Sequence, residues 1–270
     1  MDAMTETDKV FAGSIPALYD RHLGPLLFEP YARDLAGRLA GLEGHVLETA
    51  AGTGIVTRAL AQALPGSAIT ATDLNQPMLD HATRSVGAPH ITWRQADAQA
   101  LPFENASFDA VVCQFGVMFF PDKAAGFAEA SRVLRPSGRF LFNVWDRVEE
   151  NEIPAAVNEA LATLFPHDPP RFMARTPHGY HDTDRIRDAL RAAGFRRVEV
   201  ETVTLRTQAA SPRDPATGFC QGTPLRHEIE ARATGRLDEV TEHVAQALAQ
   251  RFGAGPIEGR LQAHVVSAFV

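Results

Sequence analysis

The stretch VLETAAGTG, residues 46–54, decides how the rest of the chain is interpreted. It begins as a short apolar run and ends in a turn of small residues. Residues 55–64 then follow with a helical pattern of apolar positions. A strand that passes through such a turn into a helix presents backbone N–H groups to a ligand at the carboxyl edge of a sheet. The stretch therefore predicts a nucleotide-like ligand, although the turn alone does not identify it.

From residue 45 onward, strand patterns alternate with helix patterns. Such alternation predicts an α/β fold with a mostly parallel, Rossmann-like sheet and helices on both of its faces. The second half of the chain is less regular. Its helix near residue 190 has Asp182 or Asp184 as a possible cap and Gly194 as its end. Strands are expected at residues 45–50, 68–73, 91–97, 108–115, 139–145, 198–207 and 261–270, and helices at 55–64, 76–86, 122–134, 152–165 and 182–195.

The N-terminal residues 1–41 predict a helical cap over the main body. Pro16, Pro25 and Pro30 exclude one long helix and favour several short ones, and Asp34 is expected to cap an amphipathic helix. Loops are modest throughout, so we expect one domain over residues 1–270. Residues 147–182 are interpreted as an inserted segment that covers the substrate.

Composition narrows the class of protein. The 270 residues carry a formal net charge of -7, which argues against nucleic-acid binding because that function needs a positive surface. The two cysteines lack the spacing of a zinc site, and no metal is expected. The polar N-terminus is unlike a signal peptide, and the apolar run 108–120 is too short to span a bilayer. A cytoplasmic location is predicted.

The turn does not fit either common phosphate-binding motif. The dinucleotide fingerprint G-x-G-x-x-G requires a third glycine, but that position holds Thr57 in one register and Ile55 in the other. No G-x-x-x-x-G-K-[ST] sequence is present. A phosphate-bearing cofactor is therefore disfavoured, and with it a nicotinamide-dependent oxidoreductase.

Acidic residues stand at the ends of three successive predicted strands. Glu48 precedes the turn, where it would repel a pyrophosphate but suit an ammonium group. Asp73 can accept hydrogen bonds from ribose hydroxyls, and Asp97 from the exocyclic amine of adenine. Each could instead cap a following helix or turn, but together they favour S-adenosylmethionine (SAM), a nucleoside with an ammonium group and no phosphate.

Four segments together resemble the class I SAM-dependent methyltransferases. Within that class they resemble the type 11 group, which includes ubiquinone- and menaquinone-biosynthesis methyltransferases. The resemblance implies a seven-stranded sheet with an antiparallel last strand, for which residues 261–270 are the candidate. The four segments are VLETAAGTG (46–54), ATDLNQPMLDHA (71–82), QADAQALPFENASFDAVVCQFGVMFFPD (95–122) and RVLRPSGRFLFNVWD (132–146).

The resemblance also implies a cofactor site for SAM. In that site the turn faces the methionine part, Asp73 holds the ribose, and the end of the fourth strand floors the site near the methyl group. One departure is that Ala50 replaces the first glycine of the family, which is tolerable only if its φ is negative. The implied cofactor residues are Glu48, Ala50, Gly52, Thr53, Gly54, Asp73, Leu74, Met78, Ala96, Asp97, Ala98, Gln114 and Phe115.

Methyl transfer from a sulfonium is an in-line displacement with a neutral leaving group, so positioning can supply most of the acceleration. A general base is needed only for an acceptor that must lose a proton early, and no catalytic residue is assigned. The acceptor pocket is expected around Phe11, Phe28 and Tyr31 and the segment 147–182. These aromatic residues favour a small acceptor that is apolar or aromatic. Its candidate residues are Tyr19, Phe119, Trp145, His178, Tyr180 and His181.

The predicted function is therefore SAM-dependent methyl transfer to a small molecule. The alternative is a protein that binds SAM without transferase activity. The identity of the acceptor, the atom that is methylated and the oligomeric state are left open.

Overall fold

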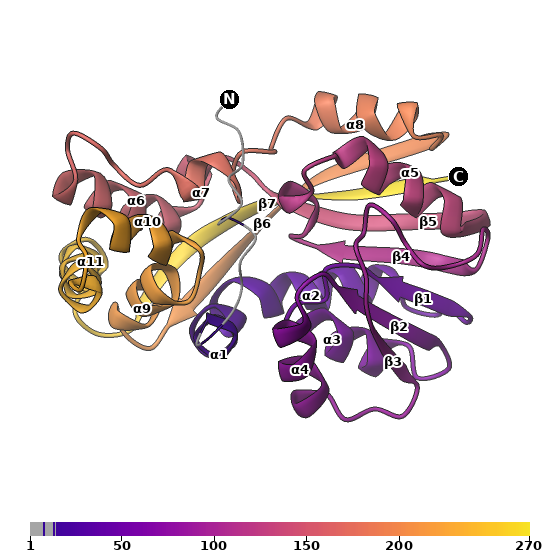
Figure 1. Ribbon diagram of the computed structural model, residues 1–270, viewed down its shortest axis with the longest axis horizontal. Helices are drawn as coiled ribbons and strands as arrows, with labels where there is room; N and C mark the ends of the chain where they lie inside the picture. The colour runs from indigo at the N-terminus through magenta and orange to yellow at the C-terminus, as the bar shows by residue number, and fades with distance from the viewer. Residues whose placement is uncertain (1–7, 9–12, 14) are drawn as a thin grey trace. The chain divides into compact units, whose positions relative to one another are not determined.

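The computed structural model describes Asp8, Gly13 and residues 15–270. Its main feature is a seven-stranded sheet with the strand order β3-β2-β1-β4-β5-β7-β6 (Figure 1). The strands are β1 (His45–Glu48), β2 (Ala68–Asp73), β3 (Ile91–Gln95), β4 (Phe108–Gln114), β5 (Leu134–Trp145), β6 (Arg197–Ala209) and β7 (Ile257–Phe269).

The directions of the strands confirm the predicted topology. Strands β1 to β5 pair in parallel. Strand β7 runs against β5, because Val270 N bonds Gly138 O at one end of the pair while Asp146 N bonds Gln262 O at the other. It also runs against β6. The sheet is thus mostly parallel, and the last strand of the chain is antiparallel to both of its neighbours.

Helices surround the sheet. Helices α3 and α4 contact β2, whereas α5 packs against α8 (Figure 1). Asp182 caps α8 by accepting hydrogen bonds from the amides of Asp184 and Arg185 at 3.0 and 3.1 Å, which confirms one of the two expected caps. The helices are α1 (Ile15–Leu18), η2 (Tyr19–Phe28), α2 (Glu29–Arg38), α3 (Ile55–Ala63), α4 (Gln76–Ser85), η3 (Val117–Phe119), α5 (Lys123–Val133), η4 (Val148–Glu150), α6 (Glu152–Leu164), α7 (Phe172–Arg175), α8 (Thr183–Ala192), α9 (Arg213–Gln221), α10 (Leu225–Arg232) and α11 (Leu237–Phe252).

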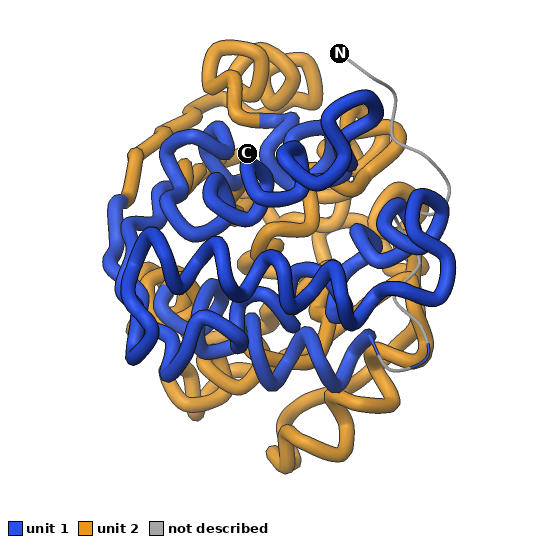
Figure 2. Tube along the Cα trace, turned by 90° about the vertical axis from the view of Figure 1, so that its left-hand side faces the viewer, with its two compact units in different colours: residues 1–30, 145–180, 204–262 blue, residues 31–144, 181–203, 263–270 orange. Residues whose placement is uncertain are grey.

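The chain divides into two compact units (Figure 2). Unit 1 comprises residues 1–30, 145–180 and 204–262. Unit 2 comprises residues 31–144, 181–203 and 263–270. The predicted inserted segment contributes most of the middle part of unit 1, and the helices α9, α10 and α11 supply much of the rest.

The core of unit 2 follows from the sequence of its central strands. Strand β4 and the second half of β5 are almost continuously apolar, as strands covered on both faces must be. Phe140 and Phe142 on β5 lie with their ring centroids 4.7 Å apart, and Phe127 of α5 packs against both of them. Strand β5 begins at Leu134, earlier than expected, and the register of its pairing with β4 shifts between Phe108 and Ala110.

The N-terminal helices differ from the prediction of short, separate pieces. Elements α1, η2 and α2 follow one another without a break, and η2 is a π-helix that contains Pro25. The bond from Glu29 N to Gly24 O shows the i→i+5 pattern of a π-helix, whose wider turns give the ring of Pro25 more room beside the carbonyl four residues earlier. Asp34 lies inside α2 rather than at its start and pairs with Arg38 one turn later. Phe11 lies outside the described residues.

A fully buried asparagine fixes part of unit 1. Asn151 accepts a hydrogen bond from Gln262 N at 3.0 Å, and its amide group donates to Arg147 O at 3.1 Å and to Gln262 O at 3.3 Å. These groups are backbone atoms, and the side chain adds hydrogen bonds to the one that Gln262 O already accepts from Asp146 N. Asn151 thereby ties the turn before α6 to strand β7.

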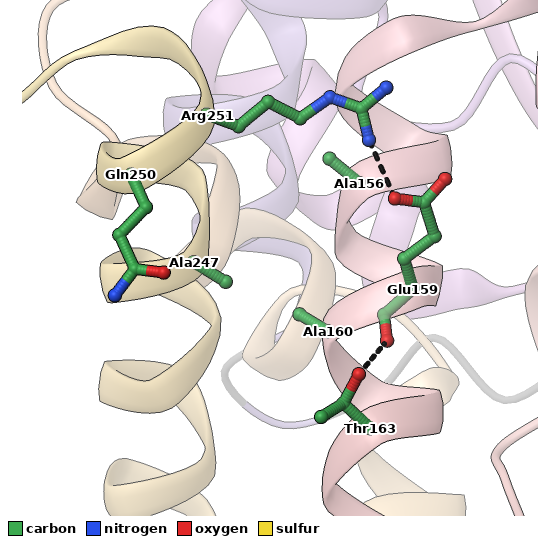
Figure 3. Close-up of a pocket in the computed structure, with 7 residues that line it drawn as sticks. All are labelled: Ala156, Glu159, Ala160, Thr163, Ala247, Gln250 and Arg251. Atoms are coloured by element: carbon green, nitrogen blue, oxygen red, sulfur yellow. Dashed lines mark hydrogen bonds and ion pairs between the residues drawn. The ribbon is translucent and has the colours of Figure 1, made fainter.

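Helices α6 and α11 of unit 1 border a cavity of about 330 Å³ (Figure 3). The methyl groups of Ala156, Ala160 and Ala247 point into the space between the helices, and an ion pair of 2.6 Å joins Arg251 to Glu159 at its edge. All of its lining residues belong to unit 1. No helix among the described residues is both long and apolar enough to cross a lipid bilayer.

Candidate functional site

The small-residue turn between β1 and α3 is held in an unusual backbone conformation. Ala50, Gly52 and Gly54 have φ values of +54°, +56° and +83°. The positive φ of Ala50 shows that the expected negative value was wrong. A left-handed conformation costs a residue with a Cβ about 1–2 kcal/mol, so the turn stores strain at the point where glycine was replaced.

The two glycines of the turn serve different purposes. A Cβ added to Gly52 would meet no atom within 4 Å, so open space lies over this part of the turn. A Cβ on Gly54 would lie 2.9 Å from Val86 Cγ2 and 3.2 Å from a ring carbon of Trp93. Gly52 thus leaves room for a ligand, whereas Gly54 lets the start of α3 pack closely against its neighbours.

Asp73 at the end of β2 clamps the turn. Its Oδ2 accepts a hydrogen bond from Gly52 N at 2.9 Å, and its Oδ1 accepts one from Asn75 N at 2.7 Å. The side chain is buried, which raises the pKa of the carboxyl group above its usual value, although the hydrogen bonds from these amides oppose the shift. The carboxylate therefore links the end of β2 to the part of the turn that has open space over it.

Glu48 is a buried acidic residue of the site, and its pKa is far above the usual value. It is 1% exposed, and its Oε2 has no hydrogen-bond partner among the described residues. Burial raises the pKa of the carboxyl group to about 8; the nearby Thr57 opposes this shift and the charge of Asp73 adds to it. A buried carboxyl group with an unpaired oxygen is suited to a cationic partner, which would favour its ionised form.

The other predicted cofactor residues of unit 2 lie at the same ends of the strands. Asp97 is half-buried, and its Oδ1 accepts from Gln99 N at 2.9 Å, so it closes the turn after β3 as the alternative interpretation allowed. Ala96 and Ala98 flank it and are half-buried. Leu74 is 48% exposed, whereas Met78 on α4 and Thr53 in the turn are buried.

The end of β4 contains a second strained residue, which the sequence did not reveal. Phe115, next to Gln114, has a φ of +49°, and its N–H donates to the Asn143 side-chain oxygen at 2.9 Å. A Cβ on Gly116 would lie 2.5 Å from the Cβ of Ala50, so this turn abuts the one after β1. Asn143 and Gly116 were not predicted as site residues. The available signals were a polar residue inside an apolar strand and a glycine directly after one.

Three of the predicted acceptor residues come together in unit 1. The rings of Tyr19 and Phe28 stack with centroids 4.7 Å apart, Phe28 lies 6.3 Å from Trp145, and Trp145 lies 6.1 Å from His178. Tyr19 and Phe28 are nine positions apart in the sequence, which would place them on opposite sides of an α-helix at 3.6 residues per turn. The wider turns of η2 bring them to one side.

The remaining acceptor candidates are divided between the units. Tyr180 is buried in unit 1, whereas Phe119 and His181 are half-buried in unit 2. His178 Nδ1 lies 2.7 Å from the carbonyl oxygen of Asp146. Because a carbonyl only accepts, Nδ1 carries the proton, and the lone pair of the neutral ring is on Nε2. In the described part of the chain, no group of three or more His, Cys, Asp or Glu side chains is arranged to hold a metal ion.

Comparison with known proteins agrees with this geometry. Residues 47–142 match the family described as a methyltransferase domain. The chain is 32% identical over 178 residues to the demethylmenaquinone methyltransferase of Deinococcus radiodurans. The matched region covers 60% of this chain and 71% of that protein. The chain belongs to the class I SAM-dependent methyltransferases.

Two further proteins show the range of this methyltransferase's relatives. A malonyl-[acyl-carrier protein] O-methyltransferase of Geobacter sulfurreducens is 35% identical over 157 residues, which are 58% of this chain and 57% of that protein. The solved structure of a Haemonchus contortus phosphoethanolamine N-methyltransferase with SAM has a TM-score of 0.60 at 16% identity and covers 94% of this chain and 56% of that one. This last likeness concerns the fold. The methyltransferase is an enzyme that uses SAM, and the oxidoreductase alternative finds no support.

The two glycines of the turn should respond differently to a methyl group. Gly54→Ala should lower the free energy of unfolding of the methyltransferase by about 2–4 kcal/mol, because overpacking and a left-handed φ both act there. Gly52→Ala should cost only about 1 kcal/mol but should weaken SAM binding strongly, since its methyl group enters the open space. Urea unfolding and calorimetry measure the two quantities. Equal losses of stability would contradict the assignment.

The raised pKa of Glu48 predicts a pH dependence of stability. The usual value of 4.5 applies to the unfolded chain and about 8 to the folded one, so the folded chain binds more protons between these values. The free energy of unfolding that depends on protonation of Glu48 is therefore fully present below about pH 4.5 and is lost as the pH rises to about 8. Relative to Glu48→Gln, the unliganded wild type should lose up to about 5 kcal/mol over this window. Parallel curves of unfolding free energy against pH would show that Glu48 is not the group responsible.

Proposed function

We propose that the methyltransferase methylates a small molecule with an apolar or aromatic part, and that the turn after β1 holds SAM. Support for a small acceptor comes from the relatives, whose names refer to demethylmenaquinone and to malonyl-[acyl-carrier protein]. One name specifies an O-methyltransferase, and that of the structural neighbour an N-methyltransferase. The acceptor atom therefore varies among similar proteins, and the chemistry of this chain's acceptor is to be found by experiment.

The single observation that carries the cofactor site is the buried oxygen of Glu48. In the proposed arrangement, Oε2 of Glu48 accepts from the ammonium group of SAM, which resolves the missing hydrogen bond and favours the ionised carboxylate. The open space over Gly52 receives the methionine part, and Asp73 retains acceptor capacity for the ribose hydroxyls. Leu74, Met78, Ala96, Asp97 and Ala98 surround the adenine, and Thr53, Gln114 and Phe115 complete the site.

The residues of the chain need to do little covalent chemistry. The sulfonium of SAM supplies an electrophilic methyl group and a neutral leaving group when it is bound. The strained turns at Ala50 and Phe115 fix the backbone around the site before the ligand arrives, which reduces the reorganisation needed for an in-line reaction. His178, with its lone pair on Nε2, is the proposed base for an acceptor that must lose a proton.

The aromatic row of unit 1 is proposed to contact the acceptor. Tyr19, Phe28, Trp145 and His178 form a continuous series of ring contacts, and aromatic rings of this kind offer flat apolar surface to an apolar or planar molecule. Tyr180, Phe119 and His181 remain predicted acceptor residues. The absence of nucleic-acid partners and the cytoplasmic location also remain predictions from composition.

Two ligands that differ in one part can separate the roles of Glu48 and Asp73. Glu48→Gln should weaken SAM binding at least about tenfold because a charge-assisted hydrogen bond is lost, but it should not change binding of 5′-methylthioadenosine, which has no ammonium group. Asp73→Asn should weaken binding of both ligands, since both contain the ribose. Calorimetry at pH 8.5 measures all the affinities. If Glu48→Gln lost equal affinity for both ligands, the ammonium group of SAM would not be the partner of Glu48.

Acceptor turnover tests the proposed function as a whole. The wild type, incubated with SAM and a panel of small apolar and aromatic acceptors, should form S-adenosylhomocysteine in an acceptor-dependent manner, and Asp73→Asn should form far less at equal SAM concentration. A thermal-shift comparison should show stabilisation by SAM and not by NAD(H). Tight SAM binding with no turnover across the panel would favour the alternative of a SAM-binding protein without transferase activity.

A further inference from the structure

A fully buried asparagine lies in the apolar part of strand β5. Asn143 is 0% exposed, and its neighbours Phe142 and Val144 are equally buried and apolar. A carboxamide in such surroundings must be hydrogen-bonded to avoid a large desolvation penalty. Its side-chain Oδ1 accepts a hydrogen bond from Phe115 N at 2.9 Å.

The orientation of this carboxamide follows from its partner. Because Phe115 contributes an N–H, the atom that faces it must be the oxygen, and the NH₂ group must point the other way. That NH₂ group is buried and has no partner among the described residues. Burying this unpaired NH₂ group costs free energy that packing alone would not require. We attribute its presence to the hydrogen bond that Asn143 makes to Phe115.

The bond falls on a strained residue. Phe115 has a φ of +49°, a conformation that non-glycine residues adopt only when their surroundings fix it. Its N–H lies within hydrogen-bond distance of both the side-chain and the main-chain oxygen of Asn143, at 2.9 and 3.2 Å. Its ring packs edge-on against Tyr31, which is fully buried. Asn143 thus supplies both acceptors that hold the strained amide.

The strained turn after β4 presses against the strained turn after β1. Gly116, which follows Phe115, comes so close to Ala50 that an added Cβ would lie 2.5 Å from the Cβ of Ala50. Ala50 itself has a positive φ, at the start of the turn proposed to hold SAM. A change in the backbone at Phe115 would therefore move Gly116 and release Ala50.

We propose that Asn143 is a positioning residue for SAM binding, which acts through Phe115, Gly116 and Ala50. This inference rests on the proposed role of the turn after β1 in holding SAM. Asp73 fixes the turn from the side of β2 through Gly52, and Asn143 fixes it from the side of β5 without touching the ligand. The two side chains hold opposite ends of the same short segment.

Two substitutions of similar size separate positioning from packing. Asn143→Asp keeps an oxygen that can accept from Phe115 N, whether the carboxyl group is ionised or neutral, whereas Asn143→Leu keeps only the volume. The affinity for SAM, measured by calorimetry well below the unfolding temperature, should fall at least about tenfold in Asn143→Leu. Asn143→Asp should remain within about threefold of the wild type. The KM for SAM should follow the same order, with a smaller change in kcat.

The second fully buried asparagine described above provides a matched control. Asn151 in unit 1 also bonds backbone groups, but it is remote in sequence from the proposed cofactor turn and belongs to the other unit. Asn151→Leu should lower the unfolding temperature and leave the affinity for SAM unchanged. This comparison removes any effect of general destabilisation on binding.

Several outcomes would overturn the proposal. Wild-type affinity in Asn143→Leu would do so, and so would equal losses in the Asp and Leu variants, or a loss in Asn151→Leu as large as that in Asn143→Leu. If Asn143→Leu does not fold, Asn143→Ser replaces it, because its hydroxyl is too short to reach Phe115 N; it should also lose about tenfold in affinity, and unchanged affinity would overturn the proposal. Failure of the wild type to bind SAM would instead refute the proposed function.

Discussion

The site depends on a carboxyl group that is buried with one of its oxygens unpaired. Removing Glu48 from water makes its charge unfavourable, and the raised pKa expresses that cost. In the same surroundings a cationic group at Oε2 would interact more strongly than in water, since little solvent screens it. The residue is therefore poorly suited to stabilising an empty protein and well suited to selecting a ligand that carries an ammonium group.

The surrounding backbone shows a related compromise between stability and function. Ala50 and Phe115, both with a positive φ, lie at the ends of adjacent strands and are held by hydrogen bonds and close packing rather than by their own preferences. Strain of this kind is maintained only where neighbouring structure enforces it. The side chains of Asp73 and Asn143 provide that enforcement, so the shape of the turn is set by the strands around it.

Local patterns in the sequence predicted the mostly parallel sheet, and the family resemblance implied its antiparallel last strand; the structure has both. The cofactor site is a prediction from the same local patterns. The turn at residues 46–54 and the acidic residues at three strand ends indicated where the ligand would bind, and the alternation of elements indicated the sheet. The sequence could not predict the positive φ of Ala50, because the surroundings of Ala50 include Gly116, which is far away in the sequence. Nor could it predict that η2 would continue through Pro25, since the tolerance of a π-helix for proline depends on a hydrogen-bond pattern that composition does not reveal.

The division of the chain also bears on how the molecule could be shortened. Each compact unit is assembled from three separate segments, so the chain passes between the units five times. Four of these crossings lie within α2, β5, β6 and β7, and the fifth lies between α7 and α8. No single cut would therefore release either unit as a continuous polypeptide, and most boundaries between the units would cut through a helix or a strand. Expressing a fragment is thus a poor route to studying either unit. Any engineered exchange of one unit must join the chain at several positions at once.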